Sequence, residues 1–304
     1  MDWDDLKIAH AIARHGSLNA AARVLGTTQP TVSRRLDALE QRIGAKLFER
    51  VASGLSPTAL CVGLIESLNH MEEGALAVER RIAARDTGLQ GPITVTSLAW
   101  FGDNVLAPLL ARFSGRHKLV IIDLVSDPRR FNLSRREADI ALRIGSFHQE
   151  YLVERRVGDV SYGLYASADY LDRHGQPNFA KGCAGHRVTS LVDSPDKVVH
   201  IEWLKAIAPR AHPILRTNGI QSHIATAEAG EAMAVLPRVL ADRRSVLIRI
   251  EPPLPEPSNT VKLGVHPDMR DTPRIRALID FLVAELKARS GELNPSKAGS
   301  APRR

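Results

Sequence analysis

The sequence predicts an all-α N-terminal domain, one long connecting helix and a C-terminal α/β domain with two lobes. Three observations support this division. Residues 2–57 are rich in short helical patterns, residues 58–87 form one long helical pattern, and strand-like runs alternate with helical runs from Ile93 to about Leu286. Glycines and a proline interrupt the pattern between residues 88 and 92. The 304 residues are enough for two or three compact units.

Composition and charge narrow the class of protein. A hydrophobic content of 44% with 25% charged residues is ordinary for a globular chain. No apolar run approaches the roughly 18 residues needed to span a bilayer, so we expect no membrane partner. Three acids among the first five residues, with no apolar segment behind them, argue against a secretory signal, and we expect a cytoplasmic protein. The net charge of +7 favours polyanionic partners.

The chain offers no pattern for catalysis, a metal or a cofactor. Cys61 and Cys183 lie far apart and outside any Cys/His cluster, so we expect two buried or half-buried thiols. No HExxH, GxSxG, phosphate-loop or dinucleotide-binding run occurs in a strand–helix setting. We therefore expect neither an enzyme nor a cofactor. His117, His148 and His223 lack a partner pattern and are expected at the surface or hydrogen-bonded in the core.

A segment that begins at Ser17 predicts the first of two short helices. Ser17 can cap the helix by accepting a backbone N–H. The small residues Ala20–Ala22 allow a second helix to approach closely, and we expect Val24 and Leu25 to supply core contacts. Gly26 can adopt a left-handed conformation and end the helix.

The second short helix comes directly after the first. We expect Thr28 to cap it, and Pro30 is tolerated in its first turn. Its apolar residues recur at the spacing of one helical face, and Gly44 closes it. These apolar residues are Val32, Leu36, Leu39 and Ile43.

The opposite face of this helix is polar. It carries Pro30, Thr31, Arg34, Asp37, Ala38 and Gln41, and its outward N-terminal half comprises Gln29, Thr31, Ser33, Arg34 and Arg35. Side chains of these types reach base edges and phosphates when such a helix enters the major groove of DNA. Arg34 is the best candidate for a base or phosphate contact. The alternative is a helical hairpin whose polar face is simply solvated.

Family-specific motifs favour DNA binding over that alternative. The runs AARVLG, QPTVSR, LE and LFER occupy residues 21–26, 29–34, 39–40 and 47–50. Residues 1–50 thereby resemble the N-terminal domain of LysR-type transcriptional regulators. The resemblance implies a winged helix-turn-helix.

The resemblance also implies roles for residues of the wing. Phe48 would anchor the wing and Arg50 would lie near the phosphates; we expect Arg35 and Lys46 to contact phosphates too. Two departures occur. The span Val51–Ser56 lacks the family's usual basic residue, and the start of the next helix departs from the family pattern, although Thr58 can still cap it.

The long helix carries an apolar stripe at heptad-like spacing, formed by Leu60, Leu64, Leu68, Met71, Ala75, Val78 and Ile82. A small winged domain cannot bury a stripe of this length, so we expect pairing with a second chain. A dimer would place two recognition helices about one turn of DNA apart, or a multiple of that. The alternative is packing on the chain's own C-terminal domain. The resemblance implies dimers through this helix, often assembled into tetramers.

The C-terminal domain shows strand and helix patterns in alternation. We expect strands at Ile93–Ser97, Leu119–Leu124 and Ala138–Ile144 in a β-α-β-α-β order, which predicts a parallel sheet. A break near Gly158 and Asp159 would lead to a second lobe that starts with a strand at Ser161–Ala166. The chain would return near His266 and end in a helix at Pro273–Leu286. Two crossings between lobes would make a hinge around a cleft.

The runs ITVTSLAWFGDNVLAPLLARF, READIALRIG and YGLYASADYL resemble the LysR effector domain, whose fold is similar to that of periplasmic binding proteins. The implied partner is a small-molecule effector. We expect it at the carboxyl ends of the strands and near helix N-termini. The candidate residues are Ser97, Ala99, Trp100, Ser126 and Arg143 from the first lobe, and Thr217, Asn218 and Gln221 from the second.

These effector residues also have simpler interpretations as helix caps or surface ion pairs, and Trp100 is either a pocket wall or core. Arg143 suggests an anionic effector, since its guanidinium pairs anions bidentately; a neutral, aromatic or redox signal stays open. Effector binding would shift the population of lobe arrangements, and with it DNA bending or contact with RNA polymerase. Activation and repression are not distinguished by any residue.

The sequence predicts four segments. They are a winged helix-turn-helix at 1–58, a linker helix at 59–88, an effector domain at 89–290 with lobe I at about 92–158 and 267–288 and lobe II at about 159–266, and a disordered tail at 291–304. Two other functions are considered. A free binding protein would need export, for which the sequence shows no signal, and a DNA-architectural protein would not need a two-lobed domain that forms a cleft.

Overall fold

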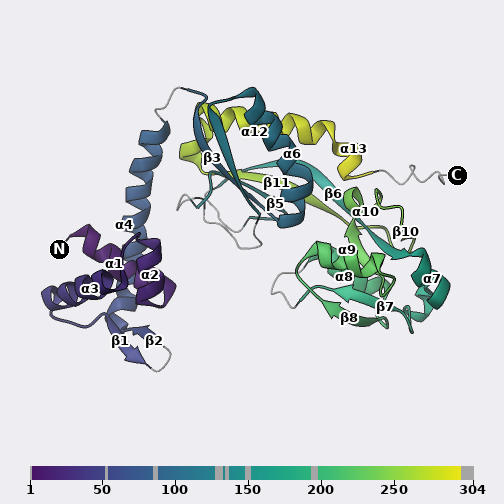
Figure 1. Ribbon diagram of the computed structural model, residues 1–304, viewed down its shortest axis with the longest axis horizontal. Helices are drawn as coiled ribbons and strands as arrows, with labels where there is room; N and C mark the ends of the chain where they lie inside the picture. Colours follow the sequence, from purple (N-terminus) through teal and green to yellow (C-terminus); the bar gives the residue numbers. More distant parts are fainter. Residues whose placement is uncertain are drawn as a thin grey trace. The chain divides into compact units, whose positions relative to one another are not determined.

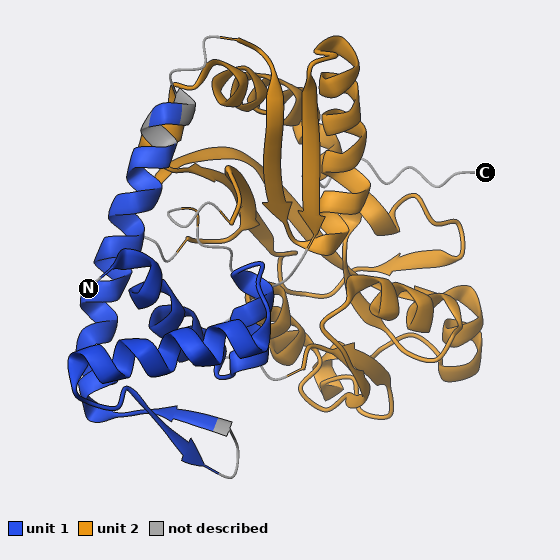
Figure 2. Ribbon diagram, turned by 60° about the vertical axis from the view of Figure 1, so that its left-hand side comes forward, with its two compact units in different colours: residues 1–82 blue, residues 83–304 orange. Residues whose placement is uncertain are grey.

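The computed structural model describes residues 2–51, 54–84, 88–126, 133, 137–147, 152–192 and 198–295. The chain divides into two compact units, residues 1–82 and 83–304 (Figure 2), and each is described by itself. The helix expected between the second and third strands of the effector domain and His148 lie outside the described residues.

The first unit is a three-helix domain with a two-stranded wing and a long helix after it (Figure 1). Its elements are α1 (Trp3–His15), α2 (Leu18–Val24), α3 (Gln29–Ile43), β1 (Phe48–Val51), β2 (Gly54–Pro57) and α4 (Ala59–Ala84). The strands pair antiparallel, with Phe48 opposite Pro57 and Arg50 opposite Leu55. The winged helix-turn-helix is therefore present.

The ends of these helices agree with the sequence in most places. The hydroxyl of Ser17 accepts the Ala20 N–H at 3.2 Å. Gly26 and Gly44 adopt positive φ values of 63° and 73°, where a glycine avoids the strain of a Cβ atom. Thr28 occupies the N-cap of α3, but its side chain caps no backbone N–H, contrary to our expectation.

The core of the first unit forms where the three helices meet. Ile12, Ala21, Val32 and Leu39 are among its fully buried side chains, and Cys61 is buried as expected. Val24 is 62% exposed, so the prediction that it supplies core contacts was wrong. A helix of seven residues turns only one face inward, and on α2 the residues Ala21 and Ala22 occupy that face.

The second unit contains a sheet of seven strands. The strand order is β10-β6-β11-β5-β3-β4, and β9 also pairs with β6. The strands are β3 (Gly91–Ser97), β4 (Val120–Ser126), β5 (Ile140–Ile144), β6 (Val153–Ser167), β9 (Ala234–Pro237), β10 (Leu247–Ile250) and β11 (Ser258–Val265), and β7 (Arg187–Ser190) and β8 (His212–Arg216) form a separate pair. As predicted, β3 runs parallel to β4 and β5.

Helices cover this unit in two groups (Figure 1). With β3, β4 and β5 lie α5 (Ala99–Phe101), the π-helical turn η1 (Gly102–Leu106), α6 (Ala107–Arg116), α11 (Pro267–Arg270) and α12 (Pro273–Ala288). The others are α7 (Ala168–His174), the 3-10 turn η2 (Phe179–Lys181), α8 (Val199–Ile207), α9 (Ile220–Glu228), α10 (Arg238–Ala241) and α13 (Ser290–Leu293).

The connection between the two lobes differs from our expectation. Strand β6 continues through Gly158 and Asp159, with only a shift of register against β11 beside Gly158, and pairs first with β11 and then with β9 and β10. The chain also re-enters the first lobe earlier than residue 266, because β11 pairs with β5 in that lobe's sheet. Glycine and aspartate suggested a break, but Asp159 is held in the ladder and its Oδ1 accepts the Thr260 hydroxyl at 3.0 Å.

The disordered tail expected from residue 291 overlaps a short helix, so its predicted start was wrong. Ser290–Leu293 forms α13, and Leu293 is only 1% exposed. Its neighbours are polar or glycine, so one buried leucine left no periodic signal in the sequence. Residues 296–304 lie outside the described residues.

Candidate nucleic-acid interface and effector-binding site

The outward face of α3 forms a shallow, open hollow on the first unit. It is lined by Gln29, Pro30, Ser33, Arg34, Asp37, Ala38 and Gln41. These positions recur every three or four residues, so they share one side of the helix. Three of the predicted DNA-binding residues line the hollow, whereas Thr31 and Arg35 do not. Asp37 and Gln41 belong to the outward face in the sequence pattern but were not among the candidates.

The neighbouring arginines of α3 differ in their surroundings. Arg35 donates to Oδ1 of Asp5 from Nε at 3.3 Å and from Nη2 at 3.0 Å, and Arg42 pairs with the other oxygen of that carboxylate. Asp5 belongs to α1 and is 8% exposed. Arg34 is exposed and makes no hydrogen bond or ion pair with the described residues. Arg34 is therefore available to a partner, while Arg35 holds α3 to α1.

A second buried acid holds the wing. Oε2 of Glu40 accepts from Nζ of Lys46 at 2.6 Å, and Oε1 accepts the backbone N–H groups of Leu47 at 2.9 Å and Phe48 at 3.2 Å. Arg50 is exposed on β1 and, within the described part of the chain, has no carboxylate partner. Among the predicted phosphate contacts, Lys46 is thus already paired and Arg50 is not.

These contacts shift the pKa values of both acids. The hydrogen bond from Arg42, opposed by burial and assisted by Arg35, holds the pKa of Asp5 below its usual value. Burial alone would raise the pKa of Glu40, but hydrogen bonds from Lys46, Leu47 and Phe48 outweigh it and lower that pKa. Both carboxylates are therefore ionised at neutral pH.

At the start of α3, two threonine hydroxyls share a hydrogen bond. Oγ1 of Thr31 lies 2.9 Å from Oγ1 of Thr28. This bond leaves Thr31 half-buried beside the hollow, and Gln29 stays exposed.

The apolar stripe of α4 is covered only around Leu64 and Leu68, since Leu60 at its start is 42% exposed. Leu68 is 4% exposed and Leu64 packs against the core of the first unit. Met71, Val78 and Ile82 are 44%, 57% and 66% exposed. The winged domain therefore covers one part of the stripe and leaves the rest exposed. This agrees with the expectation that so small a domain cannot bury a stripe of this length.

In the second unit, two candidate effector residues come together. Ser97 and Ser126 lie directly opposite each other at the ends of β3 and β4. Both Oγ atoms are buried without a hydrogen-bond partner among the described residues. A Cβ atom on Gly102 would lie 2.4 Å from the Ser126 Oγ, so the glycine lets η1 approach the two hydroxyls. A π-helical turn of this kind occurs often at functional sites.

The other first-lobe candidates are Ala99, Trp100 and Arg143. Ala99 begins α5 and is exposed. Nη2 of Arg143 on β5 donates to Oγ1 of Thr96 at 3.4 Å, which places the guanidinium beside β3. Trp100 is 9% exposed and meets Phe101 edge to face, with ring centroids 5.5 Å apart. Trp100 therefore packs in the core, and its role as a pocket wall stays a prediction.

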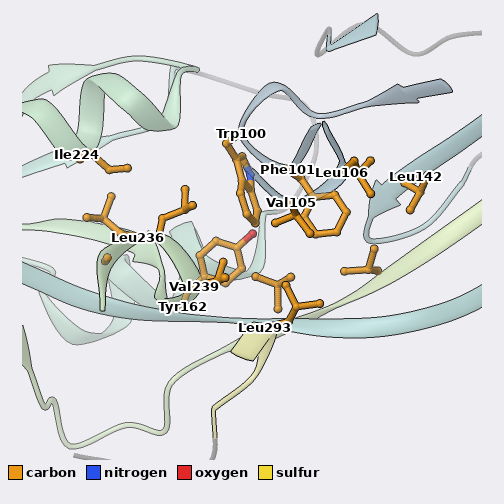
Figure 3. Packing of buried hydrophobic residues seen from close by; sticks show 14 of the residues in the cluster. Trp100, Phe101, Val105, Leu106, Leu142, Tyr162, Ile224, Leu236, Val239 and Leu293 are labelled. Carbon is orange, nitrogen blue, oxygen red and sulfur yellow. The ribbon is translucent and has the colours of Figure 1, made fainter. Parts of the chain in front are cut away.

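Figure 3 shows how Trp100 lies within the core of the second unit. Its ring points toward Tyr162, which belongs to β6, while Leu236 lies to one side and Phe101 to the other. All four residues belong to one continuous cluster of buried side chains. Residues of both lobes thus share a single apolar core around this tryptophan.

The second-lobe candidates lie at the start of α9. Oγ1 of Thr217 accepts the Gly219 N–H at 3.1 Å, while Asn218 and Gln221 are exposed. His223, one turn further on, shares a hydrogen bond of 2.7 Å with the Thr189 hydroxyl, as expected for a core histidine with a partner. The structure therefore gathers these residues locally, each with a structural contact or with solvent.

His200 is a buried histidine that the sequence analysis did not single out. Its ring stacks on Tyr162 at a centroid distance of 4.3 Å. Burial, and then the nearby charge of His223, lower the pKa of His200 to about 4, so the imidazole is neutral at physiological pH. No motif marks this position, because the stacking partner lies on a distant strand.

None of the helices in the described residues has both the length and the apolarity to cross a membrane. A helix-turn-helix with an unpaired arginine on its outward face, joined to a two-lobed α/β domain, defines a DNA-binding regulator that carries its own sensing domain. The comparisons with known proteins agree with this class.

The family described as LysR substrate binding domain matches residues 86–287, and the bacterial regulatory helix-turn-helix family of lysR type matches residues 3–61. The chain belongs to the LysR family of DNA-binding transcriptional regulators. It is 27% identical over 289 residues to the Mau operon transcriptional activator of Paracoccus denitrificans, and the match covers 92% of this chain and 95% of that protein.

Two solved structures are also similar. CrgA, a LysR-type regulator from Neisseria meningitidis, matches with a TM-score of 0.57 and 25% identity over 94% of this chain and 99% of that one. The Vibrio cholerae virulence activator AphB matches with a TM-score of 0.62 and 18% identity over 93% and 99%, which supports the fold.

The two lowered carboxyl pKa values predict a pH dependence. A carboxyl with a depressed folded-state pKa stabilises the fold above its unfolded value and loses that contribution as the pH falls. We expect Asp5→Asn to destabilise the protein by about 1.5–3 kcal/mol at pH 7, the scale of hydrogen bonds to a charged group. The difference in unfolding free energy between this variant and the unsubstituted protein should shrink as the pH falls below 3.8, the ordinary pKa of an aspartate.

Urea unfolding monitored by circular dichroism at pH 7 and pH 3 measures this effect. Asp4→Asn is the matched control, because Asp4 is an exposed neighbour with one long ion pair to Lys7. An equal loss for Asp5→Asn at both pH values would show that the charge of Asp5 is not what stabilises α3.

Proposed function

We propose that the protein binds promoter DNA as a dimer or tetramer, with α3 in the major groove and the wing on the phosphates. The observation that carries this proposal is the open face of α3, where Arg34 is exposed and has no partner among the described residues. An exposed arginine on a recognition helix fits the O6 and N7 atoms of guanine bidentately. Gln29 and Ser33 on the same face supply further donors and acceptors.

Four cations are candidates for contacts with DNA, and their surroundings in the structure indicate which of them are available. Arg35 and Lys46 each have a buried acid as partner, so a phosphate would have to compete with that acid. Arg34 and Arg50 face no such competition. We therefore assign base reading to Arg34 and the main wing contact to Arg50, with Arg35 and Lys46 as weaker phosphate contacts. Thr31 would contact the backbone near the start of α3.

We further propose that the exposed half of the α4 stripe pairs with a second copy of the chain. Met71, Val78 and Ile82 present apolar side chains on one side of the helix. Continuous apolar surface of this kind is buried in stable assemblies. A symmetric dimer would present two α3 helices to one face of the duplex.

For the sensing domain, we propose an anionic effector between the two lobes. Buried hydroxyls without partners are unfavourable unless a ligand or water accepts or donates to them, which supports a site beside Ser97 and Ser126. Arg143 would pair the anion, and the backbone N–H groups at Ala99 and Trp100 would add favourable dipoles. From the second lobe, Thr217, Asn218 and Gln221 would close over it.

Effector binding would change the relative populations of lobe arrangements. The consequence for transcription depends on where the operator lies and on contact with RNA polymerase. Such a regulator acts on the chromosome, so we place its action in the cytoplasm.

Arg34→Ala tests the base-reading role. Loss of a good bidentate contact is worth about 1–3 kcal/mol, so affinity for a site selected from a random DNA library should fall roughly 5- to 150-fold. Affinity for unrelated duplex DNA should change much less. Fluorescence anisotropy across a salt titration measures both. Arg35→Ala is the control with a partnered arginine; if Arg35→Ala abolishes specificity and Arg34→Ala does not, our ranking is wrong.

Val78→Glu tests the dimer. A carboxylate at this exposed apolar position would be buried by pairing, so the assembly should dissociate to smaller species at micromolar concentration. Sedimentation velocity measures the change. Glu73→Lys changes the charge on the opposite side of the same helix and should leave the assembly intact. An unchanged assembly for Val78→Glu would place the interface elsewhere.

Arg143→Gln tests the anionic effector. Acetate, benzoate, succinate and phosphate are titrated by calorimetry, with acetamide and benzamide as uncharged counterparts. We expect at least one anion to bind, and Arg143→Gln to weaken that anion roughly 10- to 100-fold, the scale of charge-assisted hydrogen bonds. Ser97→Ala should weaken it less. Tighter binding of the uncharged amides, or no effect of Arg143→Gln, would contradict an anionic effector paired by Arg143.

A further inference from the structure

The carboxylate of Glu40 lies at the point where the recognition helix gives way to the wing. Glu40 belongs to the last turn of α3, and its side chain is 4% exposed. Its backbone oxygen also accepts the N–H of Gly44 at 2.9 Å, where the helix ends. Glu40 therefore takes part in ending the helix as well as in binding the segment between the helix and the wing.

Both carboxylate oxygens bind the segment that leads into β1. Three consecutive residues donate to them: Lys46 from its ammonium group, and Leu47 and Phe48 from their backbone N–H groups. The carboxylate thereby satisfies two buried backbone donors that would otherwise be left unpaired. No other residue type of this length offers two anionic oxygens for such a task.

The opposite side of the same segment is fixed by the start of α4. The Thr58 hydroxyl donates to the carbonyl oxygens of Lys46 at 3.0 Å and Leu47 at 3.2 Å, and the Thr58 N–H donates to the carbonyl oxygen of Leu47 at 2.9 Å. The N–H groups of this segment thus point to Glu40 and its carbonyls to Thr58. The base of the wing is clamped between two helices.

Arg50 lies two residues after Phe48 on the same strand, so its place relative to α3 depends on this clamp. Successive strand residues alternate sides, and a shift of one residue would turn the guanidinium to the other face. We propose that Glu40 is a positioning residue for DNA binding: without touching DNA, it sets the spacing between the recognition helix and the wing cation Arg50. This inference rests on the proposed contact of Arg50 with the phosphates.

A purely structural role would have a different signature. If Glu40 only stabilised the domain, its loss would reduce the fraction of active protein and weaken binding equally at every salt concentration. If it positions Arg50, its loss removes a phosphate contact, and the dependence of log K on log salt becomes less steep by about one unit. The slope therefore separates positioning from stability.

The experiment measures binding of the full chain to a random-sequence DNA duplex at KCl concentrations from about 50 to about 300 mM. This range is wide enough to determine the slope of log K against log salt. Because Glu40→Ala would also release Lys46 to the phosphates, the variants are made in a Lys46→Ala background, where we expect Glu40→Ala and Arg50→Ala each to lower the slope by about one. The double variant should match Arg50→Ala alone, because both changes remove the same contact. Glu40→Gln keeps an oxygen that can accept both backbone N–H groups and should retain at least the slope of the Lys46→Ala background. Glu66→Gln, on the exposed side of α4, is the control and should change nothing.

The outcomes separate the proposal from the function on which it rests. If Arg50→Ala leaves the slope unchanged, the wing contact itself is wrong. If Arg50→Ala lowers the slope but Glu40→Ala does not, or if the double variant loses a further unit, Glu40 does not position Arg50. Should Glu40→Ala fold poorly, Glu40→Asp replaces it: the charge is kept but the shorter side chain cannot span the same donors, and the same criteria apply.

Discussion

The recognition helix can offer an unpaired polar face only because its other side is held firmly. Its inner face buries Val32 and Leu39, and two acids complete the attachment: Asp5 on α1 binds Arg35 and Arg42, and Glu40 binds the base of the wing. Buried carboxylates are stable only when their oxygens are satisfied. The rigidity of α3 therefore depends on ion pairs that face inward.

This arrangement divides the cations of one helix and its wing into two groups. Arg35, Arg42 and Lys46 neutralise acids within the unit, whereas Arg34 and Arg50 have no such partner among the described residues. The distinction matters because all five look alike as basic residues near a DNA-binding motif. A paired cation already interacts favourably with a neighbouring carboxylate, so its transfer to a phosphate gains little. The helix-turn-helix motif therefore identifies the DNA-binding surface, whereas the carboxylates of Asp5 and Glu40 determine which cations on that surface lack a partner.

In the sensing domain the comparable constraint is the long strand β6. It contributes to the sheet of one lobe with its first half and to the other with its second half, so both lobes share a single backbone element. Tyr162 lies where the strand passes between them, in contact with His200 by stacking and in one apolar cluster with Trp100. A change of lobe arrangement would have to repack this cluster, because close-packed cores do not deform continuously. Ser97 and Ser126 lie beside Gly102, two residues after Trp100.

The sequence by itself determined the order of elements, the helix ends at Gly26 and Gly44, the parallel strands and the outward face of α3. These features depend on local periodicity and on backbone preferences of single residues, which are readable along the chain. Tertiary structure alone decided the continuity of β6 through Gly158, the burial of Leu293, the exposure of Val24, and the separation of Arg34 from Arg35. Each of these depends on a partner distant in sequence, such as Thr260 for Asp159 or Asp5 for Arg35, and pairing energy at long range leaves no mark on local pattern.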